Sequence, residues 1–249
     1  MDKNLREKIF QEKNCVITGA TGGLGKQLAI ELARVECNLF LTGRDEEKLQ
    51  GLKNELQKEN KKIRIFYAAT DLRKTEQISK LIDTIHKTFF SVDILINCAG
   101  NFPVNPLSES SIEEFDSCMN LNIRAPFALC KEFSKDMIKN KWGRIVNIAS
   151  SSAHNGFKNA AIYCASKHAL LGLSRSLFAE LKNRNIRTFC ISPGSMKTRM
   201  AREDEGLLAE HDYNSFMEPN EVAEFITRTI SYDNEMVSQE LNLNRLIIN

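Results

Sequence analysis

Short runs of apolar and β-branched residues alternate along the chain with longer stretches in which apolar residues recur every three or four positions. Runs of the first kind predict strands, and the longer periodic stretches predict helices. The predicted strands lie at 15–18, 38–42, 63–67, 93–97, 144–148, 187–191 and 240–246. The predicted helices lie at 24–35, 46–59, 76–88, 112–121, 125–139, 160–182 and 219–230.

This alternation predicts an α/β protein whose doubly wound sheet has about seven mostly parallel strands, with helices on both faces. The chain contains no internal repeat, low-complexity segment or linker rich in proline and glycine. We therefore expect residues 1–249 to form a single domain. Because doubly wound sheets bind ligands at the carboxyl ends of their strands, we expect the functional residues in the loops after positions 18, 42, 97, 148 and 191.

Composition narrows the classes of function. Lys and Arg total 34 and Asp and Glu total 32, which gives a net charge of +2 and argues against a nucleic-acid binder that relies on bulk charge. No apolar run is long enough to cross a bilayer, and the charged first residues do not resemble a signal peptide. The seven cysteines are widely spaced, which indicates reduced thiols and no metal site. We expect a cytoplasmic protein that binds neither nucleic acid nor a membrane.

A glycine-rich segment, Thr18-Gly-Ala-Thr-Gly-Gly-Leu-Gly25, follows the first predicted strand and begins the first predicted helix. Glycines permit a tight turn and a close approach of the backbone to a pyrophosphate, and a helix N-terminus supplies unpaired N–H groups. The alternative is a flexible turn without a ligand, but the strand–turn–helix context favours nucleotide binding. The predicted contacts here are Gly19, Thr21, Gly22, Gly23, Leu24 and Gly25.

Tyr163 and Lys167 are four residues apart in the helix predicted for 160–182, so their side chains share one face. A nearby ammonium group lowers a tyrosine pKa from its ordinary value of about 10, which allows proton exchange near neutral pH. Ser150 precedes Tyr163 by thirteen residues, and its hydroxyl is suited to hold a reacting oxygen. The spacing alone is weak support, because Tyr-x-x-x-Lys is common on surface helices.

Six motifs together resemble the short-chain dehydrogenase/reductase family. They are Thr18-Gly19-x-x-x-Gly23-x-Gly25, Asn97-Cys98-Ala99-Gly100, Asn122, Ser150, Tyr163-x-x-x-Lys167 and Pro193-Gly194. The resemblance runs from about Asn14 to Met200. It implies a Rossmann-type NAD(P)-binding domain that transfers a hydride between a nicotinamide cofactor and a small-molecule carbonyl or alcohol. Reduction of 3-oxoacyl groups carried on acyl carrier protein is the specific hypothesis. The alternatives are a reductase of another ketone, sugar or alcohol, and a non-catalytic dinucleotide-binding regulatory protein.

The resemblance also implies roles for the matching residues. Tyr163 transfers the proton, Ser150 holds the substrate oxygen, and Lys167 lowers the Tyr163 pKa and binds the nicotinamide ribose. Asn122 holds a water that joins Lys167 to a proton relay; the alternative role, distortion of its helix, is compatible with the first. The further cofactor contacts that the resemblance implies are Asp71, Leu72, Asn97, Ala99, Gly100, Tyr163, Lys167, Pro193, Gly194 and Thr198.

The end of the second predicted strand indicates which cofactor is preferred. An acid at Thr42 or Gly43 would bind the ribose 2′-OH of NAD, but neither residue is acidic. Arg44 is suited to bind the 2′-phosphate of NADP. We predict NADP(H), with NAD(H) as the alternative because Asp45 follows directly. For Asp71, the alternative to adenine contact is an N-cap of the next helix.

The loop after Pro193-Gly194, residues 195–216, is predicted to bind the substrate. Arg124, Lys131 and Arg175 are candidate contacts for an acidic carrier protein, although single charges are usually only solvated surface. The family resemblance implies a homodimer or homotetramer. The tail, 240–249, lacks the paired glycines that many family members carry, so the usual tetramer geometry is not expected.

Overall fold

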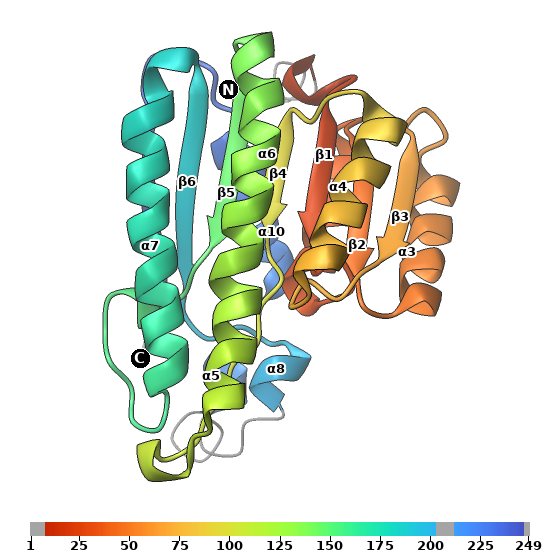
Figure 1. Ribbon diagram of the computed structural model, residues 1–249. Helices are drawn as coiled ribbons and strands as arrows, with labels where there is room; N and C mark the ends of the chain where they lie inside the picture. The colour runs from red at the N-terminus through yellow and green to blue at the C-terminus, as the bar shows by residue number, and fades with distance from the viewer. Residues whose placement is uncertain (1–7, 203–211, 247–249) are drawn as a thin grey trace.

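The computed structural model describes residues 8–202 and 212–246. Its strands form one seven-stranded sheet in the order β3-β2-β1-β4-β5-β6-β7 (Figure 1). Each neighbouring pair is parallel. The strands are β1 (Asn14–Thr18), β2 (Asn38–Gly43), β3 (Ile65–Ala69), β4 (Ile94–Asn97), β5 (Gly143–Ile148), β6 (Ile186–Pro193) and β7 (Glu240–Leu243). The predicted doubly wound α/β fold is confirmed.

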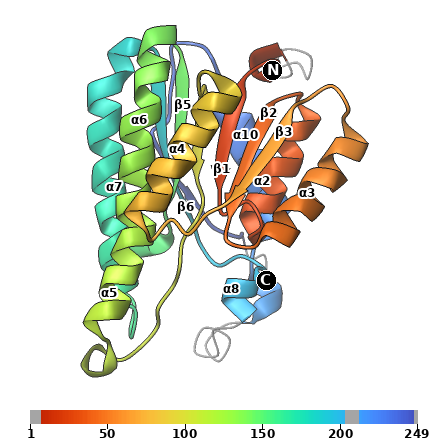
Figure 2. The same cartoon turned by 45° about the vertical axis from the view of Figure 1, so that its right-hand side comes forward.

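Helices cover both faces of the sheet (Figures 1 and 2). One face carries α2 (Gly23–Arg34), α3 (Glu46–Glu59) and α10 (Pro219–Ile230). The other face carries α4 (Thr75–Phe89), α6 (Ala125–Asn140) and α7 (Ala161–Leu181). Two shorter helices, α5 (Ile112–Met119) and α8 (Arg199–Arg202), lie in the loops beyond the sheet. Among the helices of the described ranges, none is long and apolar enough to cross a membrane.

Residues of the central strands alternate between two hydrophobic cores. In β1, Cys15 and Ile17 pack in the core that includes α2, α3 and α10, and Val16 packs in the core that includes α4 and α6. All five residues of β1 are buried, because helices cover both faces. The central strands are therefore almost continuously apolar, as the sequence pattern predicted.

The strand boundaries differ from the prediction by one to three residues, and β3 and β7 illustrate the larger differences. β3 begins at Ile65, and just before it the backbone N–H of Arg64 donates to the side-chain oxygen of Asn38 (2.9 Å). The last strand ends at Leu243, before the predicted limit of 246. Both differences lie at the edges of the sheet and leave its order unchanged.

The order of the strands reverses between β1 and β4, where consecutive strands lead to opposite edges of the sheet. Such a switch point leaves a crevice outside the carboxyl ends of the strands. Thr18, the last residue of β1, accepts hydrogen bonds on its Oγ1 from the backbone N–H groups of Cys98 and Ala99, both at 3.0 Å. The loops that follow β1 and β4 are thereby held together at this point.

Candidate active site

The glycine turn after β1 has room only for glycine at three positions. Gly19 has a φ of +66°, and a Cβ there would lie 2.8 Å from the Cα of Ala99. A Cβ on Gly25 would lie 2.1 Å from the carbonyl oxygen of Gly19. A Cβ on Gly23 would lie 2.6 Å from the Thr198 methyl group. Close backbone contacts therefore exclude a side chain at Gly19 and Gly25, and the Thr198 side chain restricts Gly23.

The first turn of α2 presents the positive end of the helix dipole to the glycine turn. Its N-cap, Gly22, makes no side-chain capping hydrogen bond, and the first turn contains no acidic residue. Leu24 packs its side chain in the core, so only its backbone can contact a ligand. This cradle of glycines at a helix N-terminus fits the pyrophosphate of a dinucleotide. Thr21, beside it, lies close to Gly43 at the end of β2.

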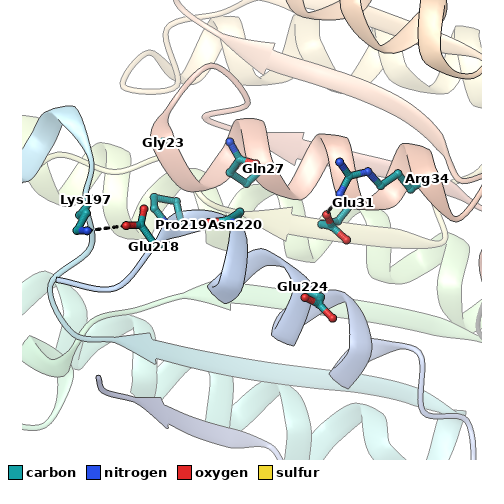
Figure 3. Close-up of a pocket in the computed structure, with 9 residues that line it drawn as sticks. All are labelled: Gly23, Gln27, Glu31, Arg34, Lys197, Glu218, Pro219, Asn220 and Glu224. Atoms are coloured by element: carbon teal, nitrogen blue, oxygen red, sulfur yellow. Dashed lines mark hydrogen bonds and ion pairs between the residues drawn. The ribbon is translucent and has the colours of Figure 1, made fainter. Parts of the chain in front are cut away.

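The segment after β6 lies against this turn. Thr198 packs on Gly23, and its neighbour Lys197 forms an ion pair with Glu218, which precedes α10. Figure 3 shows this ion pair beside Gly23, at one end of a groove that α2 and α10 form. At the end of β6, the Gly194 N–H donates to the Leu243 carbonyl (2.8 Å). Part of the predicted substrate loop, residues 203–211, lies outside the described residues.

Ser150, Tyr163 and Lys167 come together at the carboxyl end of β5. Tyr163 and Lys167 lie on one buried face of α7. The Lys167 Nζ donates to the carbonyl of Ile148 (2.8 Å) and lies 5.5 Å from the centre of the Tyr163 ring. Ser150 follows β5, and its side chain lies close enough to the Tyr163 hydroxyl to lower the pKa of that phenol. The structure thus brings together the three side chains that the sequence singled out.

Burial controls the electrostatics of this cluster. It raises the pKa of Tyr163 to about 12, against the opposing effect of the hydrogen bond with Ser150. Burial also lowers the pKa of Lys167 to about 8. The predicted lowering of the Tyr163 pKa by Lys167 is not found in the protein alone, because the loss of solvation outweighs the favourable contacts of the phenolate.

Asn122 lies in a π-helical turn, Asn120–Arg124, that joins α5 to α6. Its side-chain Oδ1 accepts from the Asn101 N–H (3.1 Å), and its Nδ2 donates to the Asn101 carbonyl (3.1 Å) and to Ser166 Oγ (2.9 Å). The predicted distortion of the helix at Asn122 is therefore present. Its amide joins the loop after β4 to α7.

Asn97, at the end of β4, is part of a buried polar chain. Its Nδ2 donates to Asn147 Oδ1 (2.8 Å), and Asn147 Nδ2 donates to Ser174 Oγ (2.9 Å) on α7. These bonds join β4, β5 and α7. Three residues along, a Cβ on Gly100 would lie 3.7 Å from the Lys167 Nζ, so the backbone at Gly100 passes close to that ammonium group.

The part of the site that is predicted to bind the adenosine contains two acidic residues. The carboxylate of each already forms an ion pair with a basic side chain of the protein. Asp45 caps α3 by accepting from the Lys48 N–H (3.0 Å), and it forms an ion pair with the Lys48 ammonium (3.0 Å). Arg73 forms two hydrogen bonds to the Asp71 carboxylate (2.9 and 2.7 Å) and lowers its pKa to about 2. Arg44 is exposed. Asp71 is thus neither a free acceptor nor the N-cap of α4, which is Lys74.

Some residues of this site were not predicted from the sequence. Ser166 is fully buried, and it donates from Oγ to the Tyr163 carbonyl (2.8 Å) while it accepts from Asn122. Ser166 lies on the same helix face as Tyr163, and this spacing could have indicated its role from the sequence. The ring of Phe102 packs against the Tyr163 ring; the signal was an aromatic residue in the loop after a central strand. Leu72 is buried, so only its backbone can contact a cofactor.

Residues 13–206 match the family model described as short chain dehydrogenase. The chain is 31% identical over 238 residues to the 3-oxoacyl-(acyl-carrier-protein) reductase FabG of Rickettsia bellii, which covers 93% of this chain and 95% of the relative. Its fold is similar to a metagenomic short-chain oxidoreductase solved with NADP (TM-score 0.82, 26% identity, 96% of this chain and 100% of the other). It is also similar to an alcohol dehydrogenase of Thermococcus sibiricus solved with 5-hydroxy-NADP (TM-score 0.84, 26% identity, 94% and 97% covered).

The buried ammonium of Lys167 predicts a particular pH dependence of stability. Its pKa falls from 10.5 to about 8 on folding, so the folded state binds this proton more weakly than the unfolded state. The resulting penalty is full below pH 8 and disappears as the pH rises towards 10.5. Lys167→Met should therefore raise the free energy of unfolding near neutral pH by up to about 3 kcal/mol.

Urea unfolding without cofactor across this pH range measures the effect. The gain from Lys167→Met should shrink between pH 8 and pH 10.5. Lys80→Met, which changes an exposed lysine of α4, should show no such dependence. An equal response to pH in wild type and Lys167→Met would contradict the assignment of a buried charge.

Proposed function

This chain belongs to the short-chain dehydrogenase/reductase family, and we propose that it is an NADP(H)-dependent oxidoreductase that reduces a carbonyl to an alcohol. The observation that carries the proposal is the buried Tyr163 side chain, which lies near Ser150 and shares a helix face with Lys167. A proton donor, an oxygen-binding hydroxyl and an ammonium group therefore meet at the edge of the sheet where the glycine cradle lies.

Each residue of the cluster has a distinct role. When bound, the nicotinamide supplies the hydride. Tyr163 donates its proton to the substrate oxygen, and Ser150 hydrogen-bonds that oxygen as negative charge develops on it. Lys167 stabilises the phenolate that remains and binds the nicotinamide ribose. Because the side-chain amide of Asn122 is already bound to Asn101 and Ser166, we assign the relay water to its backbone carbonyl.

The protonation of Tyr163 suits this residue to donate a proton to a carbonyl. With a pKa of about 12 in the protein alone, the phenol keeps its proton at neutral pH and can donate it. The same group is a weak base for the reverse reaction until a positive charge nearby stabilises the phenolate. The phenol of the protein alone is therefore in the protonated form that carbonyl reduction requires.

The loop after β2 supports a preference for NADP(H). Thr42 is buried and its hydroxyl donates to the Ala68 carbonyl (2.9 Å). Asp45, which could have bound the ribose of NAD, instead caps α3. Arg44 is exposed at the end of the strand, and its guanidinium can bind a 2′-phosphate. The two similar structures solved with NADP or 5-hydroxy-NADP agree with this preference.

Removal of the Arg44 guanidinium tests the cofactor preference. Arg44→Ala should raise the Kd of NADPH by about 10-fold to 100-fold, because charge-assisted hydrogen bonds are worth about 1.5–3 kcal/mol. The Kd of NADH should stay within about twofold. Arg34→Ala, which changes an exposed arginine at the far end of α2, is the matched control. Equal weakening of both cofactors would contradict a contact with the 2′-phosphate.

The specific substrate that we propose is a 3-oxoacyl group carried on acyl carrier protein. Similarity to the Rickettsia bellii reductase supports this choice. Arg124 and Lys131 are exposed and lie seven residues apart along the π turn and α6, which places them on one side of the helix. Arg175 forms two hydrogen bonds to Glu240 (2.7 and 2.9 Å), so its positive charge is already neutralised.

Assembly as a homodimer or homotetramer stays a prediction.

A panel of carbonyl substrates, each with NADPH and with NADH, tests the proposed function. The panel contains acetoacetyl-acyl carrier protein, acetoacetyl-coenzyme A, small ketones and ketoses. We expect NADPH oxidation with at least one carbonyl and the highest kcat/KM with the carrier-protein thioester. Tight NADPH binding without turnover across the panel would support the alternative, a non-catalytic regulatory protein.

The Tyr163→Phe variant distinguishes the role of the hydroxyl in turnover from any role in NADPH binding. It removes the hydroxyl that donates the proton, so turnover should fall by about 100-fold or more. The Kd of NADPH, measured by its fluorescence, should be nearly unchanged. Tyr232→Phe, at an exposed tyrosine, should leave both quantities at their wild-type values. Unchanged turnover in Tyr163→Phe would overturn the mechanism.

A further inference from the structure

Phe102 lies directly beside the proposed proton donor. Its ring and the Tyr163 ring have centroids 4.4 Å apart and planes inclined at 62°. The same small apolar cluster contains Ala160 and Cys164. Phe102 is half-buried and has no role in the cofactor site or in the proton transfer described above. Its aromatic ring packs against the ring of Tyr163, which is 9% exposed.

The loop that carries Phe102 is fixed on both sides. On one side, the backbone of Asn101 exchanges two hydrogen bonds with the Asn122 side chain (both 3.1 Å). On the other side, the Asn105 N–H donates to the Asn159 carbonyl (2.8 Å), and its side-chain Nδ2 donates to Glu114 Oε1 (2.8 Å). These bonds fix the backbone on both sides of Phe102, and its ring packs on Tyr163 as one side of the site.

Phe102 also borders a surface cavity. The cavity has a volume of about 410 Å³, and its other lining residues are Asn101, Pro103, Glu113, Glu114 and Ser117. One ring therefore contacts Tyr163 and lines this cavity. Truncation of that ring would open space from the cavity towards the phenol.

We propose that Phe102 is a specificity-determining residue, which limits the size of the carbonyl substituent beside Tyr163 and keeps water away from the phenol. This proposal rests on the proposed carbonyl reduction at Tyr163. The raised pKa of Tyr163, which has burial as its largest cause, agrees with a shielding role. Loss of the ring should therefore widen the range of substrates and also make the phenol more accessible and more acidic.

Phe102→Ala is the direct test, with Phe102→Leu as the variant that keeps an apolar side chain. The ratio of kcat/KM for a bulky aryl ketone to that for a small methyl ketone should rise by roughly tenfold or more in Phe102→Ala, as expected for a change in pocket volume. Phe102→Leu should lie between Phe102→Ala and wild type. Phe225→Ala, at an exposed phenylalanine of α10, should keep the wild-type ratio. An unchanged ratio in Phe102→Ala would overturn the limit on substrate size.

The pH dependence of activity is a second measurement. A general loosening of the fold in Phe102→Ala would not change its high-pH midpoint. As the pH rises, the Lys167 ammonium, whose pKa is about 8, loses its proton first, and the Tyr163 phenol, which must be protonated for reduction, sets the last midpoint at higher pH. Phe102→Ala should move this high-pH midpoint to lower pH, because water reaches the phenolate and stabilises it. The midpoint in Phe225→Ala should equal that of wild type. A midpoint that does not move in Phe102→Ala would contradict shielding.

Chemical labelling separates failure of this proposal from failure of the proposed function. N-acetylimidazole acetylates accessible tyrosine hydroxyls, and mass spectrometry gives the labelling of Tyr163 relative to Tyr232, which is 43% exposed. Labelling of Tyr163 should be low in wild type and several-fold higher in Phe102→Ala, whether or not any carbonyl is reduced. Equal labelling in both proteins would overturn the shielding by Phe102 even in an active enzyme.

Discussion

The side-chain amide of Asn122 joins the segments from which the candidate site is built. It binds both the N–H and the carbonyl of Asn101 in the loop after β4, and it donates to Ser166 on α7. Ser166 in turn donates to the carbonyl of Tyr163. A buried amide with all of its groups bound is costly to disrupt, so this network fixes Tyr163 relative to the loop that carries Gly100 and Phe102. The π-helical turn places Asn122 where it can make these bonds.

The same site carries an electrostatic cost. Lys167 is nearly fully buried, and its pKa is lowered to about 8, while burial raises the Tyr163 pKa to about 12. Two groups with strongly shifted pKa values on one helix face are typical of a functional site. Burial of an ammonium group that forms no ion pair within the described residues lowers stability, so selection for stability alone does not explain it. The arrangement is explained if the ligand supplies compensating contacts.

Much of the fold and of the site could be predicted from local pattern. The alternation of apolar strands and amphipathic helices predicted the order of the elements along the chain. The prediction was possible because buried parallel strands need helices between them. The glycine turn and the Tyr163–Lys167 spacing were recognisable because each depends on neighbours within a few residues. Ser150 was found by its fixed offset from Tyr163, and the structure brings it to the phenol.

Features that depend on distant contacts could not be predicted in this way. The pKa of Tyr163 is raised because loops from separate parts of the chain exclude water from it, among them the loop with Phe102. Asp45 and Asp71 are neutralised by Lys48 and Arg73, two or three residues away, but spacing alone does not reveal which acid is bound. The exact ends of β3 and β7 depend on edge contacts and were also missed.

The central claim is that hydride transfer from the nicotinamide and proton transfer from Tyr163 reduce a carbonyl at this site. Incubation with NADPH that carries deuterium at C4 of the nicotinamide, one position of the pair at a time, tests it most directly. The account predicts that one of the two labelled cofactors transfers deuterium to the carbinol carbon of the product, as mass spectrometry would detect. Oxidation of NADPH without deuterium in any alcohol product, from either labelled cofactor, would contradict it.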